Sequence, residues 1–197
     1  MAGKKSEIKK QIILRAALDA FSEKGFADTR MDDIAARARV AKGTLYLYFP
    51  SKEALLSAIA NHEAAQLHAA VEAVAAEPGL TLRDKLEKVL TPILDERSED
   101  PTARVLRLLW SEGLRRPELV SGLLERFVEP MIIKGELFRG LQSDEKLPEA
   151  VQRYPMLLIT PAIHGILWKG IYGKAITLDL KEFYGAYLDM IFPPSKS

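Results

Sequence analysis

The pattern of apolar residues along this chain predicts helices throughout. Apolar side chains recur at intervals of three and four residues, and no segment alternates apolar and polar residues as a half-buried strand would. Within residues 29–52 one such stripe marks a short helix, made by Met31, Ile34, Ala35 and Ala38. Leu45 and Phe49, four residues apart, predict a second short helix over about residues 42–48. We therefore predict an all-α protein.

A first long helix is predicted over about Glu7–Lys24. Its apolar stripe consists of Ile8, Ile12, Ile13, Ala16, Ala17, Ala20 and Phe21. Gly25 follows, and glycine is favoured immediately after the C-terminus of a helix. Residues 1–6 are expected to be a disordered tail. Lys4 and Lys5 would be either solvated there or placed against phosphates.

The remainder of the chain reads as further helices. The segments expected are about 51–77, 80–97, 101–115, 117–141, 148–173 and 180–191. Three of them contain an internal proline, Pro92, Pro130 or Pro161, which should kink or divide its helix.

The two short helices form a helix-turn-helix unit, because only a few residues join them. The second is too short to be stable alone. One of its faces is apolar, whereas the other offers a lysine, hydroxyl groups and a bare glycine. Such a helix suits insertion into the major groove of DNA. Together with the helix over Glu7–Lys24, the unit predicts an N-terminal three-helix DNA-binding domain.

At these residues the chain resembles a known family. The run DDIAARARVAKGTLYLYFPSKEALL, residues 32–56, is similar to the DNA-binding domain of the TetR family of bacterial transcriptional regulators. The resemblance covers about residues 7–60, and beyond them only helix lengths and order agree. Two positions depart from the family pattern: Arg39 replaces a usual glycine, and Ala41 replaces a usual serine or threonine. Glycine would ease a left-handed turn, and a hydroxyl would cap the second helix.

The resemblance and the residue chemistry together indicate DNA contacts. The hydroxyls of Thr44, Tyr46 and Tyr48 and the Gly43 amide suit phosphates, and Lys42 suits a phosphate or a guanine edge. Leu47 offers only contact with a thymine methyl group. Three further DNA contacts are expected at the starts of helices, from Thr29, Arg30 and Lys52. Thr29 is also predicted to be an N-cap. Alternatively, Tyr46 and Tyr48 are partly buried aromatic residues.

The C-terminal part, residues 53–197, is expected to bind an effector and to dimerise, whereas residues 1–52 bind DNA. Large apolar residues are candidates to line a pocket for a small, mostly apolar molecule, with two polar groups to orient it. The candidate set is Trp110, Glu112, Phe127, Met131, Phe138, His164 and Trp168. From the residues alone, a packed core explains the same pattern. The pocket gains its support from the resemblance, because TetR-like regulators bind inducers in this domain.

The last two predicted helices carry apolar residues nearly all round, which predicts burial on every side. Pairing with a second copy would supply that burial, and the resemblance implies a homodimer through these two helices. Burial within a single chain is the alternative.

Charge is unevenly distributed along the chain. The net charge of the whole is +1, but residues 1–52 hold 11 basic and 6 acidic side chains. A basic first quarter suits a partner rich in phosphate, which is double-stranded DNA in this prediction.

Other classes of function find little support in the sequence. It holds no cysteine, no Gly-rich phosphate loop, no HExxH and no nucleophile elbow, so we expect no enzyme, no cofactor and no metal. The longest apolar run, residues 155–168, is shorter than the roughly 20 residues that span a membrane. Without a signal peptide or cysteines, a cytoplasmic location is expected. The alternative function is a helical carrier or scaffold whose helix-turn-helix is only structural.

Overall fold

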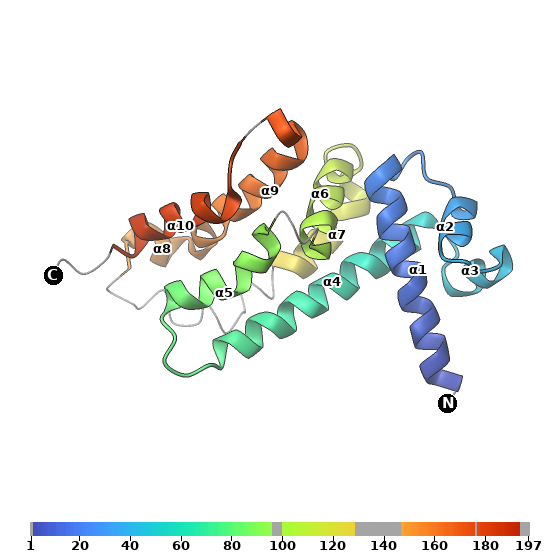
Figure 1. Cartoon of the computed structure of the whole chain (residues 1–197), viewed down its shortest axis with the longest axis horizontal. Helices are drawn as coiled ribbons and strands as arrows, with labels where there is room; N and C mark the ends of the chain where they lie inside the picture. The colour runs from blue at the N-terminus through green and yellow to red at the C-terminus, as the bar shows by residue number, and fades with distance from the viewer. Residues whose placement is uncertain (1, 96–99, 129–146, 176, 194–197) are drawn as a thin grey trace. The chain divides into compact units, whose positions relative to one another are not determined.

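The computed structural model describes residues 2–95, 100–128, 147–175 and 177–193 (Figure 1). Within these ranges all regular structure is helical and no strand occurs, which confirms the predicted fold class. Ten α-helices and two 3₁₀ turns are described. They are α1 Ala2–Lys24, α2 Met31–Arg37, α3 Lys42–Tyr48, α4 Lys52–Ala75, α5 Leu82–Leu94, α6 Pro101–Gly113, α7 Pro117–Val128, α8 Glu149–Arg153, η4 Pro155–Leu158, α9 Thr160–Tyr172, η5 Gly173–Ala175 and α10 Leu180–Ile191.

The chain divides into two compact units. The first comprises residues 1–64 and 104–124, and the second comprises residues 65–103 and 125–197. Helices α4, α6 and α7 each contribute residues to both units. The boundary that we predicted after Lys52 remains a prediction.

In the first unit, α2 packs against both α1 and α3 (Figure 1). Residues of the apolar stripes of these helices are fully buried together with the start of α4, at Ile13, Ala17, Phe21, Ile34, Leu45, Leu55 and Leu56. Ile8 and Ile12, which the predicted stripe of α1 includes, are instead 53% and 49% exposed. Gly25 ends α1 as predicted: it has a φ of 81°, and its N–H donates to the Phe21 carbonyl at 3.0 Å. Phe26 then turns inward, with its ring centroid 5.0 Å from that of Phe21.

Helix α6 is fastened to α1 by an ion pair that no sequence motif indicates. An Arg104 guanidinium nitrogen lies 2.7 Å from a carboxylate oxygen of Asp19, and Arg104 Nε donates to the Ser22 hydroxyl at 3.3 Å. The Arg104 side chain is largely buried, so solvent screens this pair less than it would an exposed one. The first unit thus includes α6 as well as the predicted three helices.

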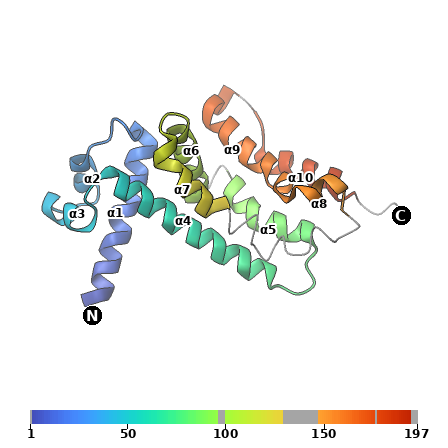
Figure 2. The ribbon, with the colours of Figure 1, turned by 180° about the vertical axis from the view of Figure 1, so that it is seen from behind.

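In the second unit, α5, α9 and α10 pack against one another, as the view from behind also shows (Figure 2). Two tyrosines of α10 hold η4 in place. The buried Tyr184 hydroxyl donates to the Leu158 carbonyl at 2.7 Å, and the Tyr187 hydroxyl donates to the Leu157 carbonyl at 2.7 Å at an exposed position. Burial raises the pKa of the Tyr184 phenol.

Several predicted boundaries need correction. Helix α1 begins at Ala2, so the tail expected over residues 1–6 is wrong for residues 2–6. The helix expected over residues 148–173 is divided into α8, η4 and α9. The break beside Pro161 agrees with the predicted effect of this proline, whereas the break before Pro155 was not predicted. Helix α10 has the predicted bounds. The predicted helix over residues 117–141 is seen as α7, and residues 129–141 lie outside the described residues.

No helix in the described part of the chain is both long and apolar enough to cross a membrane.

We predict that Tyr184→Phe lowers the free energy of unfolding by about 1–2 kcal/mol, because the buried Leu158 carbonyl loses its donor and water cannot replace it. Tyr187→Phe is the matched control, since solvent reaches the Leu157 carbonyl, and its loss should be less than half as large. Chemical denaturation of both variants measures the difference. Equal losses, or no loss in Tyr184→Phe, would contradict the role of this buried hydrogen bond.

Candidate nucleic-acid interface

The turn between α2 and α3 sets the direction of α3. After the C-cap residue Ala38, Arg39 adopts a positive φ of 55°, the only non-glycine described to do so. The Arg39 N–H donates to the Ala36 carbonyl at 3.1 Å, and the Val40 N–H donates to the Ala35 carbonyl at 3.0 Å. These two bonds form a Schellman motif, whose left-handed position usually holds glycine. The arginine therefore keeps the turn that a glycine would make more easily.

Helix α3 has only seven residues and is anchored by the one face that it buries. Leu45 is fully buried, and Phe49, which follows the helix, is buried as well. At the N-terminus of α3, Ala41 provides no side-chain cap, although its carbonyl accepts the Leu45 N–H at 3.1 Å. The helix is held by tertiary burial and not by local capping.

The opposite face of α3 is open to solvent. Lys42, Gly43 and Tyr46 are exposed, while Thr44 and Tyr48 are half-buried. Leu47 lies at the centre of this face and is 83% exposed. Space around Gly43 is also open, because a Cβ added there would meet nothing within 4 Å.

Lys42 is held at the edge of this face by an acid of α2. Its ammonium lies 2.8 Å from one carboxylate oxygen of Asp32, and this hydrogen bond raises the pKa of Lys42. Both side chains are well exposed, so the pair is screened and weak. A phosphate could therefore displace Asp32 at small cost.

Thr29 does not occupy its predicted position, and this is a correction. The N-cap of α2 is Arg30, whose backbone N–H donates to the Asp33 carboxylate and lowers the pKa of that acid. Thr29 is 1% exposed, and its hydroxyl donates inward to the carbonyls of Gly25, at 2.7 Å, and Ala20. This hydroxyl is withdrawn from solvent, whereas Arg30 is exposed. The contact of Thr29 with DNA, expected at a helix start where backbone amides meet phosphates, stays a prediction.

Lys52 has an internal role that the sequence did not suggest. Its ammonium donates to the carbonyls of Phe26, at 2.7 Å, and Ala27, at 2.9 Å, and lies 4.9 Å from the centroid of the Phe26 ring. Arg116 also lies over this ring, 4.7 Å from its centroid, and pairs with the buried Glu112. Lys52 thus joins the start of α4 to the loop before α2.

Sequence reasoning missed the partner of Tyr48. The Tyr48 hydroxyl lies 3.0 Å from the hydroxyl of Ser6 in α1, a hydrogen bond between residues 42 positions apart. Helical periodicity places Ser6 on the same face of α1 as Ile13, seven residues later, but no signal in the sequence pairs it with Tyr48.

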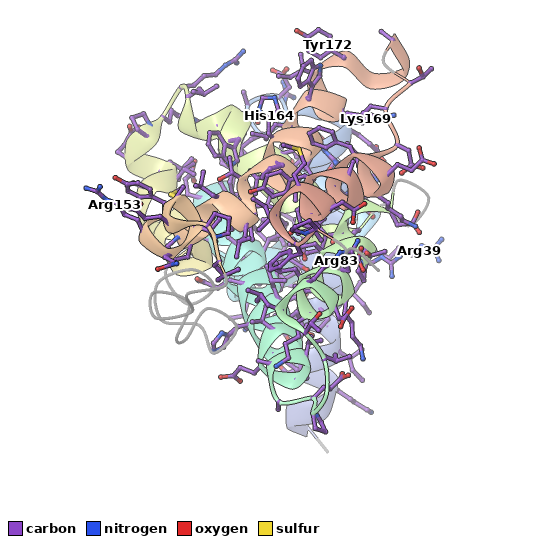
Figure 3. All side chains as sticks on the ribbon, turned by 90° about the vertical axis from the view of Figure 1, so that its left-hand side faces the viewer. Arg39, Arg83, Arg153, His164, Lys169 and Tyr172 are labelled. Atoms are coloured by element: carbon purple, nitrogen blue, oxygen red, sulfur yellow. The ribbon has the colours of Figure 1, made fainter. Side chains whose placement is uncertain are left out.

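The residues predicted to line an effector pocket are placed as follows. Trp110 and Glu112 belong to the first unit, where Trp110 is exposed and Glu112 is bound by Arg116. His164, which is labelled in Figure 3, and Trp168 belong to the second unit. They lie one turn apart on α9, with ring centroids 5.1 Å apart. The Phe127 side chain, Met131 and Phe138 lie outside the described residues. Of the four members whose side chains are described, two lie in each unit, and the predicted pocket stays a prediction.

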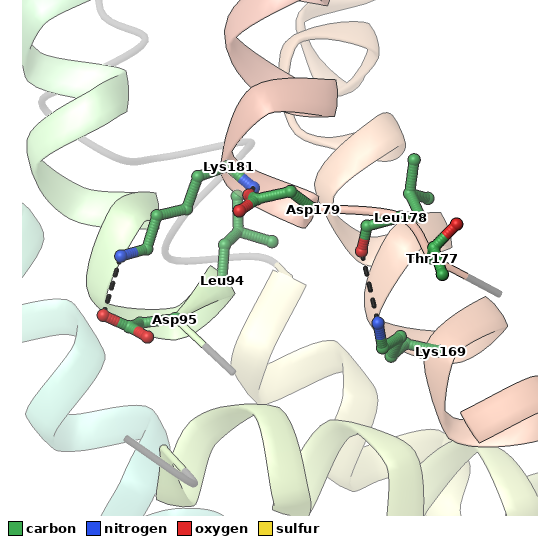
Figure 4. Close-up of a pocket in the computed structure, with 7 residues that line it drawn as sticks. All are labelled: Leu94, Asp95, Lys169, Thr177, Leu178, Asp179 and Lys181. Carbon is green, nitrogen blue, oxygen red and sulfur yellow. Dashed lines mark hydrogen bonds and ion pairs between the residues drawn. The ribbon is translucent and has the colours of Figure 1, made fainter. Parts of the chain in front are cut away.

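A different pocket of about 390 Å³ occurs in the second unit (Figure 4). Its lining residues are Leu94, Asp95, Lys169, Thr177, Leu178, Asp179 and Lys181. Lys181 pairs with Asp95 at 2.7 Å, and Lys169 donates to the Leu178 carbonyl at 3.2 Å. The pocket is largely polar and contains none of the predicted effector residues. Across the described residues, no cluster of His, Asp or Glu is arranged to hold a metal ion.

The fold and the exposed face of α3 define a helix-turn-helix DNA-binding protein. The family model for bacterial regulatory proteins of the tetR family matches residues 13–59. The uncharacterized HTH-type transcriptional regulator YhgD of Bacillus subtilis is 34% identical over 136 residues, which cover 68% of this chain and 70% of YhgD. The chain therefore belongs to the TetR family of transcriptional regulators.

Other matches are shorter or more distant. The HTH-type regulator RutR of Escherichia coli is 57% identical over 51 residues, 26% of this chain. The first relatives are matched over only 19% to 24% of their own length. The crystal structure of FadR from Bacillus subtilis in complex with stearoyl-CoA has a TM-score of 0.68 at 23% identity, covering 91% of this chain and 96% of FadR. This last likeness shows the shared fold.

We predict that Arg39→Gly raises the free energy of unfolding by about 0.5–1 kcal/mol, because glycine adopts the left-handed conformation without strain. Arg39→Ala is the matched control: it removes the same charge but keeps a Cβ, so it should bring no comparable gain. Thermal or chemical unfolding of both variants decides between charge and backbone strain. An equal gain in both would mean that the charge is responsible.

Proposed function

We propose that this regulator is a ligand-responsive repressor. A homodimer binds a palindromic operator through α3 of each copy, and a small, mostly apolar effector releases it. The proposed DNA contacts are Arg30, Lys42, Gly43, Thr44, Tyr46, Leu47 and Tyr48. Lys52 acts by holding the loop at Phe26 and Ala27, with at most one ammonium N–H left for a phosphate.

The observation that carries this proposal is the outward face of α3. Leu47 is an apolar side chain exposed at the centre of a helix that has already buried Leu45 on the other side. Gly43 weakens the helix by up to about 1 kcal/mol relative to alanine. Nothing in the described part of the chain requires glycine there, since the φ of Gly43 is not positive and the space beside it is open. A leucine that meets thymine methyls and a glycine that admits the DNA backbone explain both choices.

The last two helices support the dimer. On α9, Ile171 is 77% exposed and Tyr172 about half exposed, while on α10 Met190 is 79% exposed. Large apolar side chains exposed on two adjacent helices are typical of an interface between subunits. Regulators of this family dimerise, bind DNA and bind small effectors. A dimer would place the two α3 helices in successive major grooves, about 34–36 Å apart or a little more.

The apolar effector is supported by the composition of the chain between α6 and α9 and by neighbours of the same fold. The FadR proteins of Bacillus subtilis and Thermus thermophilus are described in complex with stearoyl-CoA and lauroyl-CoA. We extend to this chain only the class of ligand, a molecule with a substantial apolar part. Such a ligand releases the operator only if it binds the DNA-incompetent state more tightly, and DNA then weakens ligand binding reciprocally.

We predict that Gly43→Ala changes stability and DNA affinity in opposite directions. The added methyl group favours the helix by a few tenths to about 1 kcal/mol, but it stands where the backbone of DNA would approach. The operator is first isolated by selection from random-sequence duplexes with the native chain. Gel shifts with that duplex should then show at least tenfold weaker binding by Gly43→Ala.

Gly122→Ala is the matched control, because Gly122 also lies within a helix with open space around it. This variant should gain similar stability and keep native DNA affinity. If Gly43→Ala binds the operator as tightly as Gly122→Ala does, α3 does not approach DNA at Gly43. If selection enriches no sequence at all, the proposed function fails.

We also predict that Ile171→Lys combined with Met190→Lys yields monomers, because a dimer interface cannot bury two unpaired ammonium groups. Sedimentation velocity of the native chain and the variant measures the change. Leu114→Lys is the control: Leu114 is 83% exposed but lies outside α9 and α10, so this variant should stay dimeric. A native monomer, or a double variant that remains dimeric, would contradict the assigned interface.

A further inference from the structure

The hydrogen bond between Ser6 and Tyr48 joins the beginning of α1 to the end of α3. The two hydroxyl oxygens lie 3.0 Å apart. Ser6 is exposed and Tyr48 half-buried, so the contact lies at the surface of the first unit. It places the first turns of α1 beside the helix that carries most of the proposed DNA contacts.

The face of α1 that Ser6 occupies changes character along the helix. Farther along, this face is apolar and buried, at Ile13, Ala17 and Phe21. Toward the N-terminus the same face holds Ser6, Lys9 and Lys10. At 3.6 residues per turn, Lys10 lies about 40° and Lys9 about 60° around the helix from Ser6. Both lysines are exposed, so they extend along the side of α1 on which Tyr48 lies.

The charge of this segment is strongly positive. Among the first 18 residues the only acid is Glu7, and its carboxylate accepts a hydrogen bond from Gln11 at 3.1 Å. On the helical wheel Glu7 lies about 100° from Ser6, to one side of the face that carries the two lysines. Glu7 lies about 60° around the helix from Lys10, one turn away, so it offsets part of the charge. A segment whose exposed lysines outnumber its acids suits contact with a polyanion.

We propose that the first turns of α1 form a second contact surface for the DNA backbone. Lys9 and Lys10 are its phosphate ligands, and the Ser6–Tyr48 hydrogen bond fixes their position relative to α3. This inference rests on the proposed function, and it adds to α3 a contact that carries affinity without reading sequence. A contact with DNA also explains why α1 extends on the N-terminal side of its buried residues. It explains as well why Lys9 and Lys10 lie on the same side of the helix as those residues.

The physical consequence is a measurable salt dependence. Each phosphate that a lysine neutralises contributes about 0.9 to the slope of log affinity against log salt concentration. Lys9→Gln and Lys10→Gln should therefore each reduce the slope by about one. Near 0.15 M salt each should weaken operator binding roughly fivefold, and binding to unrelated duplexes by the same factor.

The experiment measures operator affinity of the full chain by fluorescence anisotropy at several salt concentrations. Arg15→Gln is the matched control: it removes one exposed positive charge from α1 at a position about 180° around the helix from Ser6. The affinity and the salt slope of this variant should stay close to those of the native chain, apart from the small effect of one positive charge fewer. Ser6→Ala should weaken binding severalfold, while Ser6→Thr, which keeps a hydroxyl, should restore it.

The outcomes separate this inference from the proposed function. If the native chain binds its selected operator but Lys9→Gln and Lys10→Gln behave like Arg15→Gln, the α1 surface is refuted and the assignment of α3 stands. A lysine variant with altered sequence preference at an unchanged slope would also refute the phosphate role. If the native chain binds no duplex specifically, both proposals fall together.

Discussion

The arrangement of the DNA-binding region depends on the burial of Leu45. Helix α3 is seven residues long, well below the roughly 12–15 residues at which isolated helices become marginally stable. It has no side-chain cap, and its first turn contains a glycine. Leu45 and the following Phe49 are therefore the groups that hold it against α2 and the core. Because only this one face is needed for anchoring, the rest of the helix is available for recognition.

The position of α3 in turn depends on how the loop after α1 is held. Phe26 is buried beside Phe21, and two cations from distant parts of the sequence, Lys52 and Arg116, lie over its ring. Arg116 is joined to Glu112, and Arg104 of the same α6–α7 region pairs with Asp19 of α1. The region 104–116 is therefore bonded directly to the helices that frame α3. In the function that we propose, a change in α6 would reach the DNA-binding region through these bonds.

Periodicity was enough to predict the helices that local sequence determines. The stripes of α1, α2 and α3, the end of α1 at Gly25 and the bounds of α10 follow from spacing and from residues with special backbone preferences. The departure of Arg39 from the family's usual glycine was also visible in the sequence. The structure shows the left-handed backbone conformation that this position requires. These features depend on neighbours within a few residues of one another.

Sequence reasoning could not foresee how distant residues compete for a side chain. Thr29 has the ordinary chemistry of an N-cap, but carbonyls at the end of α1 take its hydroxyl. Lys52 has the ordinary chemistry of a phosphate contact, but the carbonyls of Phe26 and Ala27 take two of its donors. The partners of Arg104 and Tyr48 lie 85 and 42 positions away, and a single sequence carries no signal for such pairs. The expected effector set stays a prediction, because three of its seven side chains lie outside the described residues.

The most direct test of the central claim, that α3 enters the major groove in each half of a palindrome, is methylation protection of the selected operator. Dimethyl sulfate reacts with guanine N7, which faces the major groove. The account predicts two protected major-groove segments, related by two-fold symmetry, with centres about one helical turn or a little more apart. Protection confined to one segment, or bound DNA whose guanines remain fully reactive, would contradict the assignment of α3 as the recognition helix of a dimer.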